Sequence, residues 1–407
     1  MSPPLRLWVL QMPEMLSVAN GRTMDAETFA SFRDQVRRFV RERLVSQEER
    51  VFEAGRVPQD LLDEMCDMGL FGLTTPEAYG GLGLSLGEYI ETIMEISWAA
   101  PAFRSAISIN TGMVTTAFKT SGTEAQRAEW MTKLAAGAIG CFALTEPDSG
   151  SDSAGLRTRA VRDGADYVLN GTKRYITNGP IADMVLVMAR TSAENLPKNA
   201  HISAFIVPAD TPGLTRAKAD KKMGQAGSLT GDIVLEDVRV PASALLGGEE
   251  GNGFRTAMKA LDTGRLSVGG AAIGYSRRIL ESALRYATER KAFGQPISEF
   301  QLIQAMLADS KAELYASECM IGDAIRRAEE GLPFSTEASC VKMFATEACG
   351  RIADRAVQIY GGAGYMAEYE VERFYRDVRL YRIYEGTTQI QQLVIAKNML
   401  REFAAQN

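Results

Sequence analysis

The spacing of apolar residues changes twice along the chain. From 25 to 138 these residues recur at three- and four-residue steps with charged residues between them, which is typical of amphipathic helices. From 139 to 247 they form short runs rich in β-branched and aromatic residues, separated by turn signals such as Thr211-Pro212-Gly213. From 248 to 407 the helical spacing returns in long stretches with short connections, as in an antiparallel bundle. The pattern predicts an α+β multidomain protein, with a loosely ordered, flexible extension over residues 1–24.

Several individual elements follow from local signals. A helix is expected to open at Pro58-Gln59-Asp60 and to stop at Gly69. Two strand-like runs flank Asn170-Gly171, a pair that tolerates positive φ, so we expect a β-hairpin there. Asp262-Thr263-Gly264-Arg265 is interpreted as the opening of a helix of the C-terminal bundle, with Asp262 as its N-cap if seen alone. The middle region as a whole indicates a small β-barrel or sandwich.

Composition narrows the class of protein. The hydrophobic content of 46% and charged content of 24% are those of a soluble globular protein. A net charge of -6 without a basic stripe argues against nucleic acid as a partner. No apolar run approaches the roughly 18 residues that a membrane span needs. The five cysteines form no CxxC pair and indicate a reducing compartment. We therefore expect a cytoplasmic location, or the mitochondrial matrix in a eukaryote.

The single histidine excludes several kinds of catalysis. His201 alone cannot supply the two or three imidazoles of a hydrolytic zinc site, and a Ser-His-Asp or Cys-His mechanism would depend on it. It lies at the edge of an apparent strand, where we expect a solvated turn residue. Chemistry near neutral pH is therefore expected from a carboxylate, a lysine or a bound cofactor, without a metal.

The most informative segment is Tyr384-Glu385-Gly386-Thr387-Thr388-Gln389. A helix follows it, with apolar positions at Ile390, Leu393, Val394 and Leu400. Thr387 or Thr388 is the expected N-cap, so the positive end of the helix dipole faces Glu385. A carboxylate on such a turn is placed to act as a general base, whereas taken alone it merely favours a helix N-terminus.

Four other segments join this one in a fixed order. They are Phe142-Ala143-Leu144-Thr145-Glu146-Pro147-Asp148-Ser149-Gly150-Ser151-Asp152, Lys173-Arg174-Tyr175-Ile176-Thr177-Asn178-Gly179, Glu289-Arg290-Lys291-Ala292-Phe293-Gly294 and Gln358-Ile359-Tyr360-Gly361-Gly362-Ala363-Gly364-Tyr365. Each motif is weak alone, but together the five resemble the acyl-CoA dehydrogenase family over residues 25–400. The resemblance implies an N-terminal α-helical domain, a middle β-barrel and a C-terminal four-helix bundle.

The resemblance also implies bound FAD, sandwiched between the middle domain and the bundle. Thr145 and Thr177 are the expected hydroxyl partners of the flavin edge, and Tyr175 supplies a smaller aromatic wall where many relatives have tryptophan. The other expected flavin residues are Phe142, Leu144, Ile176, Thr387 and Gln389. A second set matches positions that hold the pyrophosphate and adenosine in the family, some of them from a neighbouring subunit: Arg290, Phe293, Gln301, Gln358, Gly361 and Gly362.

For the substrate, the resemblance assigns Glu385 as the base that removes the α-proton of an acyl-CoA thioester. Asp262 and Arg265 match the element that meets the thioester chain, Ser151 lies near the CoA entrance, and the backbone at Gly386 holds the thioester carbonyl. One subgroup of the family takes its base from the position before this arginine. Here that position is Gly264, which cannot serve, so Glu385 is the base candidate supported by motif.

Arg104 carries the substrate prediction. The stretch from Ala100 to Ser108 resembles glutaryl-CoA dehydrogenase, in which the arginine pairs with the distal carboxylate of a dicarboxylyl chain. A buried arginine is costly unless it is paired, and a substrate carboxylate would be the partner. Ser97 replaces a glutamate of that enzyme, so we expect desaturation without decarboxylation. The alternatives are a salt bridge within the protein or a solvated helix face, with a short- or medium-chain monocarboxylic substrate.

The expected partners also follow from the resemblance. They are an electron-transfer flavoprotein as electron acceptor and further copies of the chain in a homotetramer, because family members complete a neighbour's FAD site. Two other functions stay open: an acyl-CoA oxidase that uses oxygen, and a non-catalytic flavoprotein that acts as an assembly factor. The second would be expected to lack the base or the flavin motifs, and this chain keeps both.

Overall fold

A computed structural model describes residues 23–191 and 201–406 of the chain. The described part begins with a helical region in which helix follows helix up to residue 135. A continuous helical path from residue 101 to 121 contains one π-helical stretch, Ile109–Val114, and leads into a second path over 124–135. The named helices are α1 (Ala26–Arg38), α2 (Glu48–Ala54), α3 (Gln59–Asp67), α4 (Leu86–Ile96), α5 (Pro101–Ser108), α6 (Thr115–Ser121), α7 (Glu124–Gln126) and α8 (Thr132–Ala135).

Local signals explain where these helices start and end. Ser85 caps α4 by accepting a hydrogen bond from the backbone N–H of Glu88, whose carboxylate accepts in return from the backbone of Ser85. The helix expected from Pro58 to Gly69 is confirmed as α3, and Gly69 follows with φ of 76°. Glu88 also accepts from the backbone N–H groups of Thr23 and Met24. The rest of the predicted N-terminal extension lies outside the described residues.

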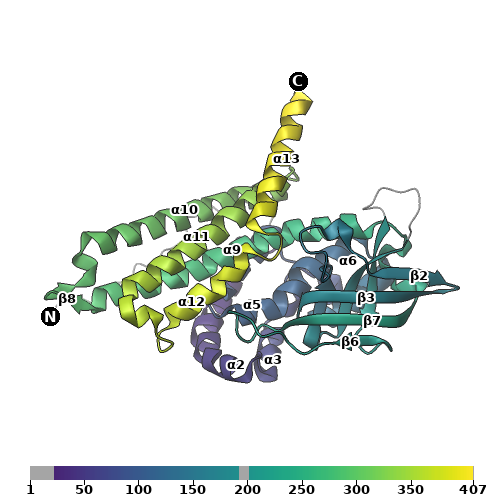
Figure 1. The fold of residues 1–407 in the computed structure, drawn as a ribbon, viewed down its shortest axis with the longest axis horizontal. Coiled ribbons are helices and arrows are strands. Elements are labelled where there is room, and N and C mark those ends of the chain that lie inside the picture. The colour runs from purple at the N-terminus through teal and green to yellow at the C-terminus, as the bar shows by residue number, and fades with distance from the viewer. Residues whose placement is uncertain (1–22, 192–200, 407) are drawn as a thin grey trace.

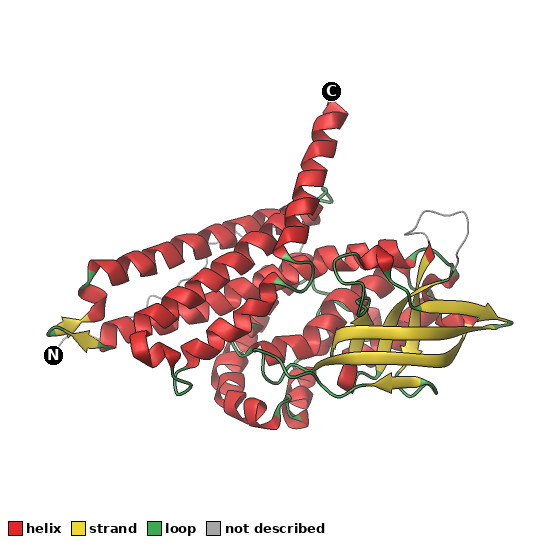
Figure 2. Ribbon diagram, in the orientation of Figure 1, coloured by secondary structure: helices red, strands yellow, loops and turns green. Residues whose placement is uncertain are grey.

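One mixed sheet forms the middle region. Its strands are β1 (Gly140–Ala143), β2 (Arg159–Asp163), β3 (Asp166–Thr177), β4 (Met184–Arg190), β5 (Ile202–Pro208), β6 (Leu214–Arg216) and β7 (Thr230–Pro241). They run in the order β1-β4-β2-β3-β7-β6, with β5 paired to β4. The pair β1–β4 is parallel and the long pair β3–β7 is antiparallel. The predicted order of helical, β and helical regions is confirmed (Figure 2).

The hairpin predicted at Asn170-Gly171 is wrong. Both residues lie inside β3, and the turn into this strand comes earlier, at Gly164. The register between β3 and β7 shifts at Gly171, so the segment is a bulge, and the Asn170 side chain pairs with Asp237 on β7. A Cβ atom at Gly171 would lie 2.4 Å from Oγ1 of Thr158. The glycine is thus explained by a close approach within the sheet.

The C-terminal region consists of long helices. They are α9 (Gly253–Glu289), α10 (Gln301–Glu329), α11 (Ser335–Tyr360), α12 (Glu370–Val378) and α13 (Thr388–Gln406), with a small hairpin of β8 (Lys291–Ala292) and β9 (Gln295–Pro296) between the first two. Figure 1 shows α9, α10 and α11 side by side along the molecule, and α13 projecting from it. Since α9 begins at Gly253, Asp262 lies in its third turn, and its predicted place at a helix start is wrong.

The two helical regions share one hydrophobic core. Side chains of α4, such as Ile90 and Ile93, pack in the same buried cluster as Ile273 of α9 and Val341 of α11. A separate cluster on one face of the sheet includes Tyr167, Val185 and Phe205. A third cluster joins β4 and β5 to α6 and to the first turns of α9. Helix α9 therefore packs against both the N-terminal helices and the sheet.

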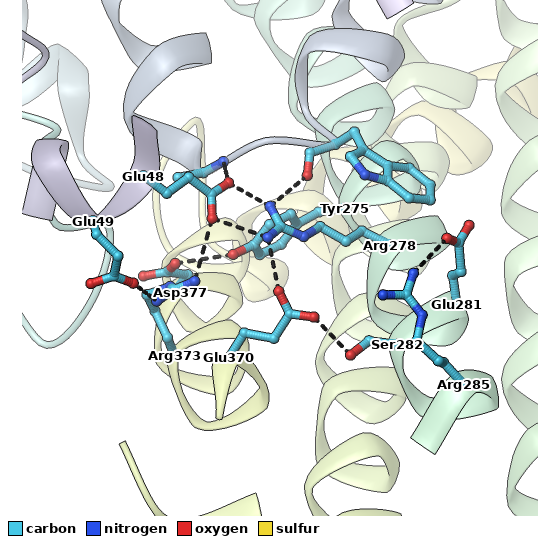
Figure 3. Close-up of polar contacts among 12 residues, drawn as sticks. Glu48, Glu49, Tyr275, Arg278, Glu281, Ser282, Arg285, Glu370, Arg373 and Asp377 are labelled. Atoms are coloured by element: carbon cyan, nitrogen blue, oxygen red, sulfur yellow. Dashed lines mark hydrogen bonds and ion pairs between the residues drawn. The ribbon is translucent and has the colours of Figure 1, made fainter. Parts of the chain in front are cut away.

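A buried ionic network joins α2, α9 and α12 (Figure 3). The Arg278 guanidinium on α9 donates to both carboxylate oxygens of Glu48 on α2 and, at 2.8 Å, to Glu370 of α12. Oε1 of Glu48 also accepts from the backbone N–H of Ala100 at 2.8 Å, directly before α5. The network thus fixes the start of the helix that carries Arg104.

His201 differs from its prediction. Its side chain is buried, and its carbonyl accepts from the backbone N–H of Thr191. The reason is its place directly before β5, whose first six residues are all buried. Within residues 23–191 and 201–406, no cluster of His, Cys, Asp and Glu side chains is arranged to hold a metal ion. In the same ranges, no helix is long and apolar enough to cross a membrane.

Candidate active site

An internal pocket forms where the three regions meet. Its walls come from α5, from the π-helical stretch after it, from the end of β3, from α9 and from the turn before α13. The lining residues are Arg104, Ser105, Ser108, Ile109, Met113, Thr177, Gly264, Ser267, Tyr384 and Glu385. The predicted base, the predicted flavin partner Thr177 and the predicted substrate residue Arg104 therefore line one pocket, although they are up to 281 positions apart in the chain.

Glu385 sits on an unusual turn. Its φ is 56° and that of Gly386 is 87°, so two successive residues adopt left-handed conformations. For glutamate this conformation costs free energy, of the order of 1 kcal/mol or more. Thr387 begins the helix, because its Oγ1 accepts from the backbone N–H of Ile390 at 3.2 Å. A strained residue held in a pocket is a feature of functional sites.

The carboxylate of Glu385 is held in a mixed environment. Its Oε2 is buried and has no hydrogen-bond partner among the described residues. Burial raises the pKa of Glu385, and the positive charges of Arg104, Lys342 and Arg265 oppose that rise. Gly264 of α9 lies directly against this carboxylate. An unpartnered carboxylate with a raised pKa is suited to accept a proton.

Arg104 is buried in the same pocket, and its hydrogen-bond partners in the described chain are hydroxyl groups rather than carboxylates. Nη1 donates to the Tyr384 hydroxyl and Nη2 to Ser267 Oγ, both at 3.0 Å, while Nε is buried without a partner. Burial opposes the charge, but Tyr384, Tyr89 and Glu385 among its neighbours keep the pKa of Arg104 above its ordinary value. Neither a protein salt bridge nor a solvated helix face describes this residue.

Two other predicted substrate residues, Asp262 and Arg265, lie beside the pocket. On α9, Nη1 of Arg265 donates to Oδ1 of Asp262 at 2.6 Å, and the same oxygen accepts from Ser335 at 3.1 Å. Arg265 is buried, with its Nε unpartnered. Ser151 is exposed on the loop between β1 and β2, apart from the pocket lining.

The residues predicted for the flavin edge gather at one end of the sheet. The carbonyl of Thr145 accepts from the backbone N–H of Arg174 at 2.8 Å, which places the segment after β1 beside β3. Tyr175 has a φ of 57° and is 65% exposed, so its ring lies open on the surface of the chain. Phe142, Leu144 and Ile176, which were also predicted to contact the flavin, are buried, whereas Thr387 is half-buried directly before α13. Half-buried hydroxyls next to an apolar wall and an open aromatic ring fit the edge and face of a flavin.

The residues predicted for the pyrophosphate and adenosine lie elsewhere. All six are exposed, and none lines the pocket: Arg290, Phe293, Gln301, Gln358, Gly361 and Gly362. Helix α9 explains the separation, because its 37 residues span about 55 Å. It starts against β5 and ends just before Arg290, at the opposite end of the molecule from the sheet (Figure 1). One chain therefore does not bring the two sets together.

Several residues of the site were missed from the sequence, among them Ser267, Lys342, Tyr384 as a partner of Arg104, and Gln391. Lys342 donates to the carbonyl of Gly386 at 2.6 Å, and Gln391 donates to the carbonyls of Glu385 and Gly386, both at 3.1 Å. A lysine inside the apolar run Val341–Ala345 was the available signal, since charged side chains are rare on a buried helix face. Gln389, predicted as a cofactor residue, is exposed.

Models of all three domains of one family match the chain. The N-terminal domain of acyl-CoA dehydrogenases matches residues 26–138, the middle domain 141–238 and the C-terminal domain 251–400. The chain is 42% identical to the probable acyl-CoA dehydrogenase YngJ of Bacillus subtilis, over 91% of this chain and 97% of that protein.

Two other relatives have more specific names. The chain is 40% identical to the caffeyl-CoA reductase-Etf complex subunit CarC of Acetobacterium woodii, over 86% of this chain and 92% of that one. It is 38% identical to the mitochondrial short-chain specific acyl-CoA dehydrogenase of Mus musculus, over 93% and 91%.

Solved structures agree with this fold. Butyryl-CoA dehydrogenase from Megasphaera elsdenii superposes with a TM-score of 0.87 at 35% identity, covering 91% of this chain and 98% of that one. A glutaryl-CoA dehydrogenase from Mycobacterium smegmatis, in complex with FADH2, gives a TM-score of 0.86 at 34% identity, covering 92% and 95%.

Proposed function

Because this chain belongs to the acyl-CoA dehydrogenase family and is an FAD-dependent oxidoreductase, we propose that Glu385 is its catalytic base. The proposal rests mainly on Oε2 of Glu385, which is buried in the pocket and has no hydrogen-bond partner in the described chain. Burial also raises the pKa of this carboxyl group. Glu385 takes the α-proton of the thioester, and the neighbouring backbone at Gly386 holds the thioester carbonyl as negative charge develops on it. The product is a trans-2-enoyl-CoA.

The remaining residues bind and orient. Bound FAD supplies the acceptor for the hydride that leaves the β-carbon. Thr145 and Thr177 hold the edge of its ring, Tyr175 covers a face, and Thr387 at the start of α13 lies beside them in the proposed arrangement. Asp262 and Arg265 orient the thioester chain, and Ser151 stands at the CoA entrance. Closing the pocket around the acyl chain excludes water and strengthens these interactions.

Replacing the base by its amide tests this assignment. Purified Glu385→Gln is expected to keep its bound FAD and its melting temperature, because the shape of the side chain is unchanged. Its turnover with the best acyl-CoA should fall at least ~10²-fold, the low end for a positioned base. Wild-type turnover in this variant, at full FAD content, would show that another group removes the proton.

For the substrate, we propose an acyl chain that ends in a second carboxylate, bound by Arg104. The support is a buried guanidinium whose partners in the described chain are neutral hydroxyls and whose Nε has none. Removing a guanidinium from water is costly, and a carboxylate in the pocket would offset that cost. Ser97 is buried and does not ionise, so it has no charge that could repel the distal carboxylate of the substrate. Desaturation is therefore expected to leave that carboxylate in place.

The competing proposal is a short- or medium-chain monocarboxylic acyl-CoA. The observations in its favour are the names of two similar proteins, a short-chain specific acyl-CoA dehydrogenase and butyryl-CoA dehydrogenase. In that case Arg104 would serve only as a counter-charge to Glu385, which lies close enough to affect its pKa. Comparing thioesters of equal chain length separates the two.

We further propose an electron-transfer flavoprotein as the electron acceptor and a homotetramer as the assembly. The acceptor is supported by the similar chain named as a subunit of an Etf complex. The tetramer is supported by the distance between the two FAD-binding sets within one chain, which a neighbour's residues would close. Hydrogen peroxide formed at the turnover rate would instead indicate an oxidase. A yellow protein that an acyl-CoA does not bleach would indicate a non-catalytic flavoprotein.

A further inference from the structure

Two buried side chains hold the turn that carries Glu385. Lys342 on α11 donates to the carbonyl of Gly386 at 2.6 Å. Gln391 on α13 donates to the carbonyls of both Glu385 and Gly386 at 3.1 Å. Neither side chain reaches solvent. The turn consists of two successive left-handed residues, which persist only where the surroundings over-determine them.

Packing alone does not explain the lysine at this position. Lys342 lies in an apolar stretch of α11, and its Nζ donates a hydrogen bond to a neutral carbonyl, that of Gly386. Burial lowers the pKa of Lys342 to about 8, so the fold holds a charged group against a desolvation cost. An apolar residue of similar length would fill the space at lower cost. The lysine must therefore contribute something other than packing.

The charge of Lys342 acts on the site. The groups whose charges bear on Lys342 are Glu385 on the turn, Arg265 on α9 and Glu347 on α11. Among them, Glu385 carries the chemistry. The positive charges of Arg104 on α5, Lys342 on α11 and Arg265 on α9 all favour its ionised form. Lys342 thus combines a hydrogen bond to the turn with an electrostatic effect on the carboxylate.

We propose that Lys342 is a positioning residue for α-proton abstraction: it anchors the Glu385-Gly386 turn through the Gly386 carbonyl and places a positive charge near the Glu385 carboxylate. Gln391 supplies the second anchor and no charge. The proposal rests on Glu385 being the base. It predicts that the two anchors differ in one measurable way, because only the loss of Lys342 changes the electrostatics of the carboxylate.

The test compares three variants with wild type in the rate of flavin bleaching by acyl-CoA across pH. Lys342→Met removes hydrogen bond and charge, Lys342→Gln removes the charge and keeps a donor, and Gln391→Leu removes the other anchor. FAD content and melting temperature are recorded for each protein. Glu385→Gln is included, and its retained bleaching would contradict the assignment of the base without bearing on the anchors.

For Lys342→Met, the bleaching rate at pH 7 should fall at least about tenfold, since a misplaced base is costly. The acid limb of its pH profile should move to higher pH, because losing a nearby positive charge raises the pKa of a carboxylate. Lys342→Gln should show the same displaced limb with a plateau rate closer to wild type. Gln391→Leu should have a lower plateau rate than wild type, while the acid limb of its pH profile should stay at the wild-type position.

Two results would overturn the proposal. One is a wild-type acid limb in both Lys342 variants. The other is an equal displacement of the limb in Gln391→Leu, which would indicate a general loosening of the turn. If Lys342→Met does not fold, Lys342→Gln and Gln391→Leu decide the question by the same comparison of limbs.

Discussion

Gly264 and Glu385 share one small volume of the pocket. A Cβ atom built on Gly264 would lie 2.5 Å from Oε2 and 3.1 Å from the carboxyl carbon of Glu385. The carboxylate therefore occupies the space that a side chain at position 264 would need. In one subgroup of the family the base comes from that position. A carboxylate carried at position 264 and one carried at position 385 would therefore reach the same part of the pocket. The glycine here is explained by the carboxylate next to it.

The first prediction concerns Gly264→Ala. The added methyl group would displace the Glu385 carboxylate, so the rate of flavin reduction should fall at least about tenfold. The free energy of unfolding should stay level or rise by up to about 1 kcal/mol, because alanine favours a helix interior over glycine. Stopped-flow reduction and urea unfolding measure the two effects. Activity and stability falling together would point to a general packing defect instead.

The second prediction is a pH dependence. Burial raises the pKa of Glu385, and the base works only when it is deprotonated. The rate constant kcat/KM should therefore fall as the pH is lowered through that raised pKa, above the range of an ordinary glutamate. Steady-state assays from acid to neutral pH would show the limb, with protein integrity checked by FAD fluorescence. A profile that stays flat down to the ordinary carboxyl range would contradict it.

The third prediction is the preference set by Arg104. A dicarboxylyl-CoA should exceed a monocarboxylyl-CoA of equal chain length at least tenfold in kcat/KM, and Arg104→Ala should abolish that preference. Removing one partner of a buried charge pair typically costs ~2–5 kcal/mol, so tenfold is a modest expectation. The monocarboxylyl rate of the variant is the internal control. Butyryl- or octanoyl-CoA outperforming every dicarboxylyl thioester would return Arg104 to a purely structural role.

The fourth prediction concerns the buried ionic network. Arg278→Met would leave Glu48 and Glu370 without their shared cation and should lower the free energy of unfolding by about 3–5 kcal/mol. Arg285→Met is the matched control on the same helix. Its pair with Glu281 is exposed, so a loss of about 1 kcal/mol or less is expected. Equal losses in the two variants would show that the buried network contributes no more to the free energy of unfolding than an exposed ion pair.

The fifth prediction concerns assembly. Three apolar side chains on the outer part of α13, Met399, Leu400 and Phe403, are 59%, 70% and 69% exposed. If a second copy covers them, the double variant Leu400→Asp with Phe403→Asp should shift the mass in light scattering below that of a tetramer and lower the FAD content. Arg401→Asp, on the same helix, is the charge control. A wild-type monomer that retains FAD would contradict the assembly itself.

The sequence predicted some kinds of secondary structure better than others. The region that holds the long amphipathic helices α10 and α11 was predicted to be helical, because a 3.6-residue repeat over many turns leaves little ambiguity. The error at Asn170-Gly171 arose because the same dipeptide suits a tight turn and a bulge inside a strand. Which of the two forms is decided by the partner strand β7, far away in the sequence.

The errors at Asp262 and His201 have a similar origin. Aspartate is a common helix cap, but nine residues of α9 precede Asp262. Its carboxylate instead accepts hydrogen bonds from the side chains of Arg265 and Ser335. His201 is polar, yet the strand that follows it is buried and carries it inside. In both cases a tertiary contact overrode a local preference.

The order of the three regions, the family, and the base candidate Glu385 on its turn before a capped helix could all be predicted from the sequence alone. These depend on short motifs and on periodicity, which act over a few neighbouring residues. The surroundings of the proposed base could not be predicted in this way: Gly264 against its carboxylate, Arg104 with neutral partners, and Lys342 and Gln391 on the backbone of the turn. These residues come from four separate helices, and distances between helices are set by core packing rather than by any local pattern.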